Sequence, residues 1–186
     1  MTAVDVEAFI ASTHAMLEGH FKLASGRHSQ RYIEKFRIME DPVATVGLCG
    51  MIADYFRSAE PTVVVGPAMG GVILAFETAR ALGVRAIFTE KDPAGRHMFD
   101  RGFQVKPDDR VLVVDDVLTT GGSVRQVLDL LSRMDRKAIG IGFLIDRAGG
   151  KVEFGIPYFT CQQFSFESYD PASCPLCDKG LPLVET

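Results

Sequence analysis

Residues 111–123 combine carboxylates, hydroxyls and glycines directly after an apolar run, in the order VLVVDDVLTTGGS. The apolar run predicts a buried strand. Asp115 and Asp116 end that strand at the edge where ligands of open α/β sheets bind. Loop 119–123 then enters a predicted helix, so backbone N–H groups, hydroxyls and the helix N-terminus can surround a phosphate. Because the carboxylates can accept hydrogen bonds from sugar hydroxyls, the segment indicates a site for a sugar phosphate.

Three further structures could contain two adjacent aspartates at a strand end. A P-loop nucleotidase would use them for magnesium, but it needs a Gly-x-x-x-x-Gly-Lys-Ser/Thr loop, which the chain lacks. A dinucleotide site needs Gly-x-Gly-x-x-Gly after a strand, and the chain has none. A solvated acidic turn does not account for carboxylates, hydroxyls and glycines in one strand-loop-helix unit.

The elements that must position this loop alternate along the middle of the chain. Short apolar runs predict strands, and the segments after them have helical spacing. The predicted strands are 63–65, 85–89, 110–114 and 138–145, and the predicted helices are 72–82 and 123–134. Fully apolar strands alternating with helices indicate an α/β fold whose parallel sheet is covered on both faces.

The N-terminal part has a different pattern. Apolar residues recur at helical spacing over 6–17 and Gly19 follows, which predicts an amphipathic helix that stops there. Residues 21–38, which mix bulky and basic side chains over 31–38, predict a turn with short strands. Asp41-Pro42 opens a predicted helix at 43–57, because proline suits the first helical turn.

Composition restricts the class of protein. The chain has 186 residues, 47% hydrophobic and 24% charged, as in ordinary globular domains. With 20 basic and 24 acidic residues the net charge is −4, which disfavours nucleic acid as a partner. There is no apolar run of ~18 residues and no signal-peptide layout, so we expect a cytoplasmic protein without a membrane partner. Four cysteines do not make a disulfide framework.

A long polar segment, 90–106, lies between the second and third predicted strands. Polar loops of this length are uncommon in compact domains and often form active-site lids. The cations available to such a lid are Lys91, Arg96, His97, Arg101 and Lys106.

The tail ends in Cys-Pro-Leu-Cys. Cys174 and Cys177 have the spacing of half a zinc site, but a tetrahedral site needs two further ligands. Because Cys49 and Cys161 are isolated in the sequence, we favour a reduced turn in the tail.

Four other side chains are expected to have structural roles. His14 and His20 are assigned to the surface or cap of the first helix. Met69 and Phe76 are assigned to loop or core packing rather than to stacking on a base.

Segment 111–123 resembles the phosphoribosyl pyrophosphate signature of the type I phosphoribosyltransferases. Three further segments make the chain similar to orotate phosphoribosyltransferases. Segment 21–29 resembles their Leu-x-Ser-Gly-x-x-Ser sequence, 66–71 their Gly-Pro-Ala loop, and 143–147 the strand end that bears their base-binding arginine. The resemblance covers residues 1 to about 160, and the tail resembles a branch of that family.

The resemblance implies a type I phosphoribosyltransferase-like fold, in which helices flank a central parallel sheet under a small N-terminal hood. We expect a single domain over 1–186. Within it, 1–40 would form the hood and N-terminal segment, 61–148 the α/β core and 160–186 the tail.

The resemblance also implies a pentosyltransferase activity that depends on Mg²⁺. Phosphoribose would pass from 5-phosphoribosyl 1-pyrophosphate (PRPP) to N1 of orotate, giving orotidine 5′-monophosphate and pyrophosphate in UMP biosynthesis. The magnesium would be held mainly by the substrate rather than by protein ligands. The family forms homodimers with shared active sites.

Site residues follow from the resemblance by position. Lys91, Asp115 and Asp116 would be catalytic, with Lys91 on a mobile loop that reaches the neighbouring subunit's site. Thr119 and Arg147 would face orotate, since a guanidinium can bind a carboxylate through two hydrogen bonds. The residues that would bind PRPP are Lys91, Asp115, Asp116, Val117, Leu118, Thr119, Thr120, Gly121, Gly122 and Ser123.

The chain departs from the family pattern where many relatives have cations, at Ala24, Gly70 and Glu90. Arg96 or His97 would then serve in the lid. The candidates to replace the N-terminal cation are Arg27, His28, Arg31 and Lys35. Two alternatives therefore stay open: a phosphoribosyltransferase for another nucleobase, and an inactive nucleotide-sensing regulator.

Overall fold

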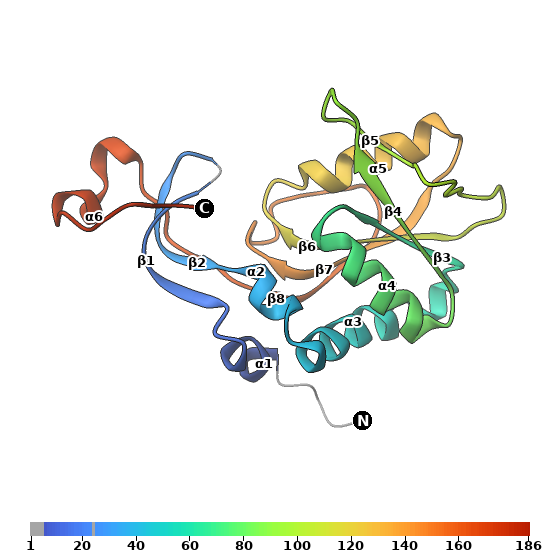
Figure 1. Cartoon of the computed structure of the whole chain (residues 1–186), viewed down its shortest axis with the longest axis horizontal. Helices are drawn as coiled ribbons and strands as arrows, with labels where there is room; N and C mark the ends of the chain where they lie inside the picture. The colour runs from blue at the N-terminus through green and yellow to red at the C-terminus, as the bar shows by residue number, and fades with distance from the viewer. Residues whose placement is uncertain (1–5, 24) are drawn as a thin grey trace.

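The computed structural model of the chain describes residues 6–23 and 25–186. A six-stranded sheet with helices on both faces forms the larger part, and a three-stranded sheet with the C-terminal segment lies beside it (Figure 1). No helix within these described ranges is long and apolar enough to cross a membrane.

The larger sheet has the strand order β5-β4-β3-β6-β7-β8. Every neighbouring pair is parallel except β4 and β5, which form an antiparallel hairpin at one edge. The strands are β3 (Val63–Pro67), β4 (Arg85–Lys91), β5 (His97–Met98), β6 (Val111–Leu118), β7 (Ala138–Asp146) and β8 (Tyr158–Gln163). The predicted parallel sheet and its four inner strands are confirmed.

Successive side chains of each strand point to opposite faces, and both faces are buried. Val64 belongs to the apolar cluster under α3 (Pro42–Phe56) and α4 (Gly70–Leu82). Val63 and Val65 belong to the cluster under α5 (Gly122–Arg133). This two-sided burial explains why the inner strands are continuous apolar runs in the sequence.

The three helices that cover the two faces, α3, α4 and α5, have clear sequence signals and lie within two residues of their predicted bounds. The Asp41 side chain accepts hydrogen bonds from the backbone N–H groups of Val43 and Ala44, which caps α3. Gly83 ends α4 in the left-handed region, with φ 73°.

The predicted first helix is wrong beyond its second turn. Helix α1 (Val6–Ser12) ends before His14, whose φ is 51°, and residues from Met16 onward form β1 (Met16–Lys22). β1 pairs with β2 (His28–Ile33), so tertiary pairing overrides the helical spacing. The short strands predicted over 21–38 are confirmed by the end of β1 and by β2. The prediction is wrong beyond Ile33, because Glu34 caps the short helix α2 (Lys35–Met39).

The C-terminal elements carry weak sequence signals and were not predicted. β8 is an edge strand with mostly half-exposed side chains, so it shows no apolar run. β9 (Val184–Glu185) pairs in parallel with β1 and completes the small sheet, although both of its side chains are exposed. The short helices η1 (Arg57–Ala59), η2 (Pro171–Ser173) and α6 (Pro175–Asp178) complete the fold.

Candidate active site

A cavity of about 680 Å³ lies where the carboxyl ends of β3, β6 and β7 face the β1–β2 hairpin. The sheet edge contributes the Asp115–Asp116 pair and part of the following loop. The hairpin side contributes Ser29, Tyr32 and Lys35. The cavity therefore opens at the edge that the sequence indicates for a ligand.

The two carboxylates differ in their environment. The backbone N–H of Asp116 donates to Asp115 Oδ1 over 2.9 Å. Burial, followed by the neighbouring charge of Asp116, raises the pKa of Asp115 from 3.8 to about 7. Asp116 Oδ2 instead lies 2.7 Å from Lys35 Nζ. The pair therefore has one cation for two acids, and a ligand that donates hydrogen bonds can stabilise the second charge.

The raised pKa of Asp115 predicts a pH-dependent stability. Between pH about 4 and 7 the folded chain holds a proton that the unfolded chain releases, so stability falls as pH rises through that window. The Asp115→Asn variant carries an amide that cannot ionise. We therefore expect its melting temperature to be a few degrees above that of the parent at pH 8 and equal to it at pH 4.5. Differential scanning fluorimetry without ligand measures this, with the exposed Asp129→Asn as control. An equal offset of Asp115→Asn at both pH values would contradict the assignment.

Lys35 is the cation that the structure brings to this site, and spacing alone did not identify it. Burial by itself lowers the pKa of Lys35, but the charge of Asp116, the hydrogen bond to Asp116 and the charge of Asp115 together raise it. A Cβ placed on Gly70 would lie 2.2 Å from Asp116 Oδ2, so no side chain fits at residue 70 without moving Asp116.

The other candidate cations are engaged elsewhere. Arg27 donates to Ser168, Arg31 lies 3.5 Å from Glu18, and His28 contacts Cys177. Ala24, the remaining departure on this side, lies outside the described residues.

The loop after β6 has the geometry of an anion site. Thr119, Thr120 and Ser123 line the cavity, and the first-turn amides of α5 follow them. Gly121 has φ 76°, and a Cβ there would lie 2.8 Å from the Phe154 ring, so the position requires glycine. Val117 also lines the cavity, whereas the Leu118 side chain is buried in the apolar cluster under α5.

Arg147 lines the same cavity from the end of β7. Its guanidinium lies 5.7 Å from the centre of the Phe166 ring, and burial lowers its pKa. The neighbouring Asp146 carboxylate accepts instead from the backbone N–H groups of Ala148 and Gly150, at 2.6 and 3.0 Å. Among the described residues no carboxylate lies within 4.0 Å of Arg147. A half-buried guanidinium is therefore free to bind an anionic ligand.

Comparison with known proteins shows the family of the chain. The phosphoribosyl transferase domain family matches residues 42–171. The orotate phosphoribosyltransferase of Carboxydothermus hydrogenoformans is 44% identical over 187 residues, which cover 100% of this chain and 97% of that protein. The Thermotoga maritima enzyme is 42% identical over 95% of this chain and 94% of its own. The chain belongs to the orotate phosphoribosyltransferase family.

Solved structures confirm the fold of this family member. The orotate phosphoribosyltransferase of Aeropyrum pernix superposes with a TM-score of 0.69 at 27% identity, covering 86% of this chain and 93% of that one. The adenine phosphoribosyltransferase of Rhodothermus marinus superposes with a TM-score of 0.67 at 20% identity, covering 86% and 100%. Because the fold also serves adenine enzymes, the base must be argued from the side chains of the cavity.

The predicted lid segment of this phosphoribosyltransferase begins with a short hairpin and continues as a loop. β4 and β5 form an antiparallel hairpin that projects from the sheet (Figure 1). Lys91 and His97 lie opposite each other in the backbone pairing of its two strands. Lys91 is exposed and does not line the cavity. The Glu90 carboxylate forms an ion pair of 2.8 Å with the Arg101 guanidinium. A cation is therefore present beside residue 90, where many relatives have a cation themselves.

Arg96 and His97, the two further cations expected in the lid, are both occupied within this hairpin. Arg96 pairs with Asp92 at 2.8 Å. His97 is buried, with its Nδ1 2.8 Å from Thr89 Oγ1.

The four side chains expected to have structural roles differ in their surroundings. His14 is exposed just after α1, as expected. The prediction that His20 belongs to the first helix is wrong, because His20 is a buried residue of β1. Met69 precedes α4, lines the cavity and is 78% exposed. The Phe76 side chain is 65% exposed, so the prediction that it packs in the core is wrong.

Proposed function

We propose that this protein transfers phosphoribose from PRPP to N1 of orotate, giving orotidine 5′-monophosphate and pyrophosphate in pyrimidine nucleotide biosynthesis. Membership of the orotate phosphoribosyltransferase family supports the reaction. The choice of base rests on the guanidinium of Arg147. It lies in the cavity that holds Asp115 and Asp116, and no carboxylate of the described residues is within 4.0 Å of it.

The donor would lie along the sheet edge. Loop 119–123 would bind its 5′-phosphate through amides and hydroxyls, with the positive N-terminus of α5 behind them. Asp115 and Asp116 would accept hydrogen bonds from the ribose hydroxyls, which fixes the sugar. Lys35 Nζ lies 2.7 Å from Asp116 Oδ2, so it supplies a counter-charge for this carboxylate and helps to hold it in place beside the sugar.

Orotate would lie on the Arg147 side of the cavity. Its carboxylate matches the planar guanidinium, which can donate two parallel hydrogen bonds. Phe166 packs against that guanidinium and restricts its position. Thr119, at the junction of the loop and the cavity, would donate to the base beside the sugar.

Breaking the bond from C1′ to the pyrophosphate builds positive charge on the ribose and negative charge on the leaving group. Mg²⁺ bound with PRPP would neutralise the departing pyrophosphate. The two aspartates offer the oxygen ligands that this ion prefers, but Asp116 is already paired with Lys35. We therefore expect the oxygens of PRPP to hold most of the Mg²⁺ coordination, while the two carboxylates are oriented toward the sugar hydroxyls.

A panel of bases tests the proposal. The purified protein is incubated with PRPP, Mg²⁺ and either orotate, uracil, adenine or hypoxanthine, and pyrophosphate and nucleotide are measured. We expect fast turnover with orotate, slow turnover with uracil and none with either purine. A preference for a purine would show that orotate is not the base that this protein uses. Donor binding without turnover of any base would identify a nucleotide-sensing regulator instead.

We also propose a homodimer with shared active sites, as the family resemblance implies. Lys91 lies outside the cavity of its own chain, so a partner's cavity is the site that it could reach. Helices α2, α3 and α4 pack against one another and carry large exposed apolar side chains, which are typical of an interface. These side chains are Phe36, Val43, Val46, Ile73 and Phe76.

Mixing inactive subunits should restore activity. Lys91→Ala lacks only the lid lysine, and the Asp115→Asn, Asp116→Asn double variant lacks only the carboxylates. A heterodimer of the two has one intact site if Lys91 acts on its partner, so random reassociation should recover about a quarter of parental activity. Lys137→Ala, which removes an exposed lysine outside the 90–106 segment, should by itself retain parental activity. Verified heterodimers without activity would exclude the shared site.

A further inference from the structure

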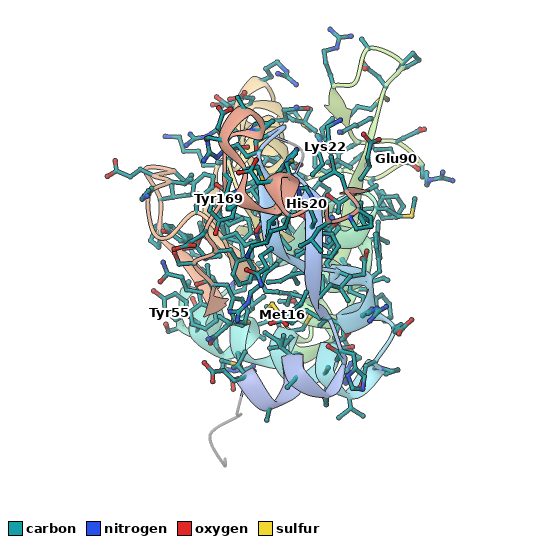
Figure 2. The ribbon with its side chains drawn as sticks, turned by 90° about the vertical axis from the view of Figure 1, so that its left-hand side faces the viewer. Met16, His20, Lys22, Tyr55, Glu90 and Tyr169 are labelled. Atoms are coloured by element: carbon teal, nitrogen blue, oxygen red, sulfur yellow. The ribbon has the colours of Figure 1, made fainter. Side chains whose placement is uncertain are left out.

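Two histidines of the three-stranded sheet and two cysteines of the C-terminal segment lie close together. Helix α6 lies on the side of this sheet that faces away from the six-stranded sheet (Figure 1). His20 lies in β1, His28 begins β2, Cys174 is the N-cap residue of α6, and Cys177 lies within α6. One ligand atom from each of the four residues lies within 4.8 Å of all the others. Figure 2 labels His20 and Tyr169 on this side of the molecule, where the strands meet the C-terminal segment.

The distances match those between the ligands of a tetrahedral metal. Bonds of ~2.0 Å to nitrogen and ~2.3 Å to sulfur at tetrahedral angles place nitrogen and sulfur ligands about 3.6 Å apart. The Sγ atoms of Cys174 and Cys177 lie 3.6 and 3.7 Å from His20 Nε2, and Cys177 Sγ lies 3.4 Å from His28 Nδ1. The two nitrogens are 2.9 Å apart, and a bound ion would move them to about 3.3 Å.

A hydrogen bond outside the cluster sets His20 in the form that binds metal. His20 Nδ1 lies 2.9 Å from the backbone carbonyl of Leu181, which can only accept, so Nδ1 carries the proton. In the neutral ring Nε2 then has a free lone pair directed at the cluster. Metal-binding histidines usually donate their other N–H in this way.

Burial and chemistry select the ion. Three of the four side chains are buried, and all four cysteines of the chain are free thiols. Two thiolates with two imidazoles in a tetrahedral arrangement are typical of structural zinc sites, which use all four positions for protein ligands. We propose that this protein binds one Zn²⁺ through His20 Nε2, His28 Nδ1, Cys174 Sγ and Cys177 Sγ.

The site would join parts of the chain that are distant in sequence. Cys174 lies 154 positions from His20, so the ion would cross-link the N-terminal hairpin to the tail. Weaker links surround it: the bridge from His28 to Tyr169, and the pairing of β9 with β1. Ser29 of the hairpin and Thr186 of the tail line the cavity, so the ion would fix one wall of the active site.

Metal analysis of the intact protein tests the proposal. Protein expressed with added zinc should contain about one zinc per chain by inductively coupled plasma mass spectrometry. Zinc should fall to near zero in Cys177→Ser. Cys161→Ser, whose hydroxyl can keep the bond to Leu48, and His14→Asn, which tolerates the positive φ, should keep the parental zinc content.

A second measurement does not depend on how the variants fold. The parent is stripped with a chelator, dialysed under reducing conditions and titrated with Co²⁺ alone. We expect the visible bands of tetrahedral cobalt and a thiolate-to-cobalt charge-transfer band that saturate at one equivalent, and a melting temperature that rises with added Zn²⁺.

Two results would overturn the proposal. One is protein without zinc that also gives no tetrahedral cobalt spectrum, which would leave the cluster as a set of hydrogen bonds between thiols and imidazoles. The other is a mass two hydrogens lower without reductant, which would assign Cys174 and Cys177 to a disulfide.

Discussion

The Asp115→Asn, Asp116→Asn double variant is expected to lose PRPP binding while remaining folded. Both carboxylates line the cavity directly before the phosphate loop, and an amide cannot supply the charge that strengthens their bonds to ribose hydroxyls. Two hydrogen bonds to charged groups contribute ~3–6 kcal/mol, so affinity should fall about 10²- to 10⁴-fold. Isothermal titration calorimetry with PRPP and Mg²⁺ measures the loss.

Two controls separate a lost contact from a lost fold. The double variant should remain folded with a single cooperative thermal transition at pH 8, because removing the buried charge of Asp115 offsets part of the loss of the ion pair between Asp116 and Lys35. Asp108→Asn with Asp129→Asn changes two exposed aspartates away from the cavity and should bind PRPP as the parent does. A folded double variant with parental affinity would remove the carboxylates from the donor site.

The fold could be predicted where its signal is local in the sequence. The strand β6, its carboxylates and the start of α5 are consecutive, so one segment shows burial, charge and turn chemistry together. The same holds for α3, whose cap and first-turn proline adjoin each other. β8 gave no signal because an edge strand that is half exposed depends on backbone pairing with β7.

The residues that were missed depend on contacts between distant parts of the chain. Lys35 was one of four candidate cations, and only the tertiary structure places it on Asp116. His20 was assigned to a helix because residues 16 and 17 continue the spacing of α1. A hairpin around Ser25-Gly26 was the available signal, since it would have brought His20 and His28 to one end of two strands.

Arg147→Ala is expected to raise the Michaelis constant for orotate while leaving PRPP affinity nearly unchanged. The guanidinium has no carboxylate partner among the described residues, so orotate would supply its counter-charge. Loss of a charge-assisted contact contributes ~1.5–3 kcal/mol, which corresponds to a rise of roughly 10- to 150-fold. Steady-state kinetics with orotate varied at saturating PRPP measure it.

Substrate and side-chain comparisons make the Arg147 result specific. Arg147→Lys should recover only part of the loss, because an ammonium lacks the planar pair of donors. Uracil has no carboxylate, so it should be a poor substrate for the parent and nearly indifferent to Arg147→Ala. Arg133→Ala, an exposed change at the far end of α5, should leave both substrates unaffected. If Arg147→Ala instead weakens PRPP and spares orotate, the guanidinium binds the donor, and the orotate carboxylate must be recognised by another cation such as Lys35.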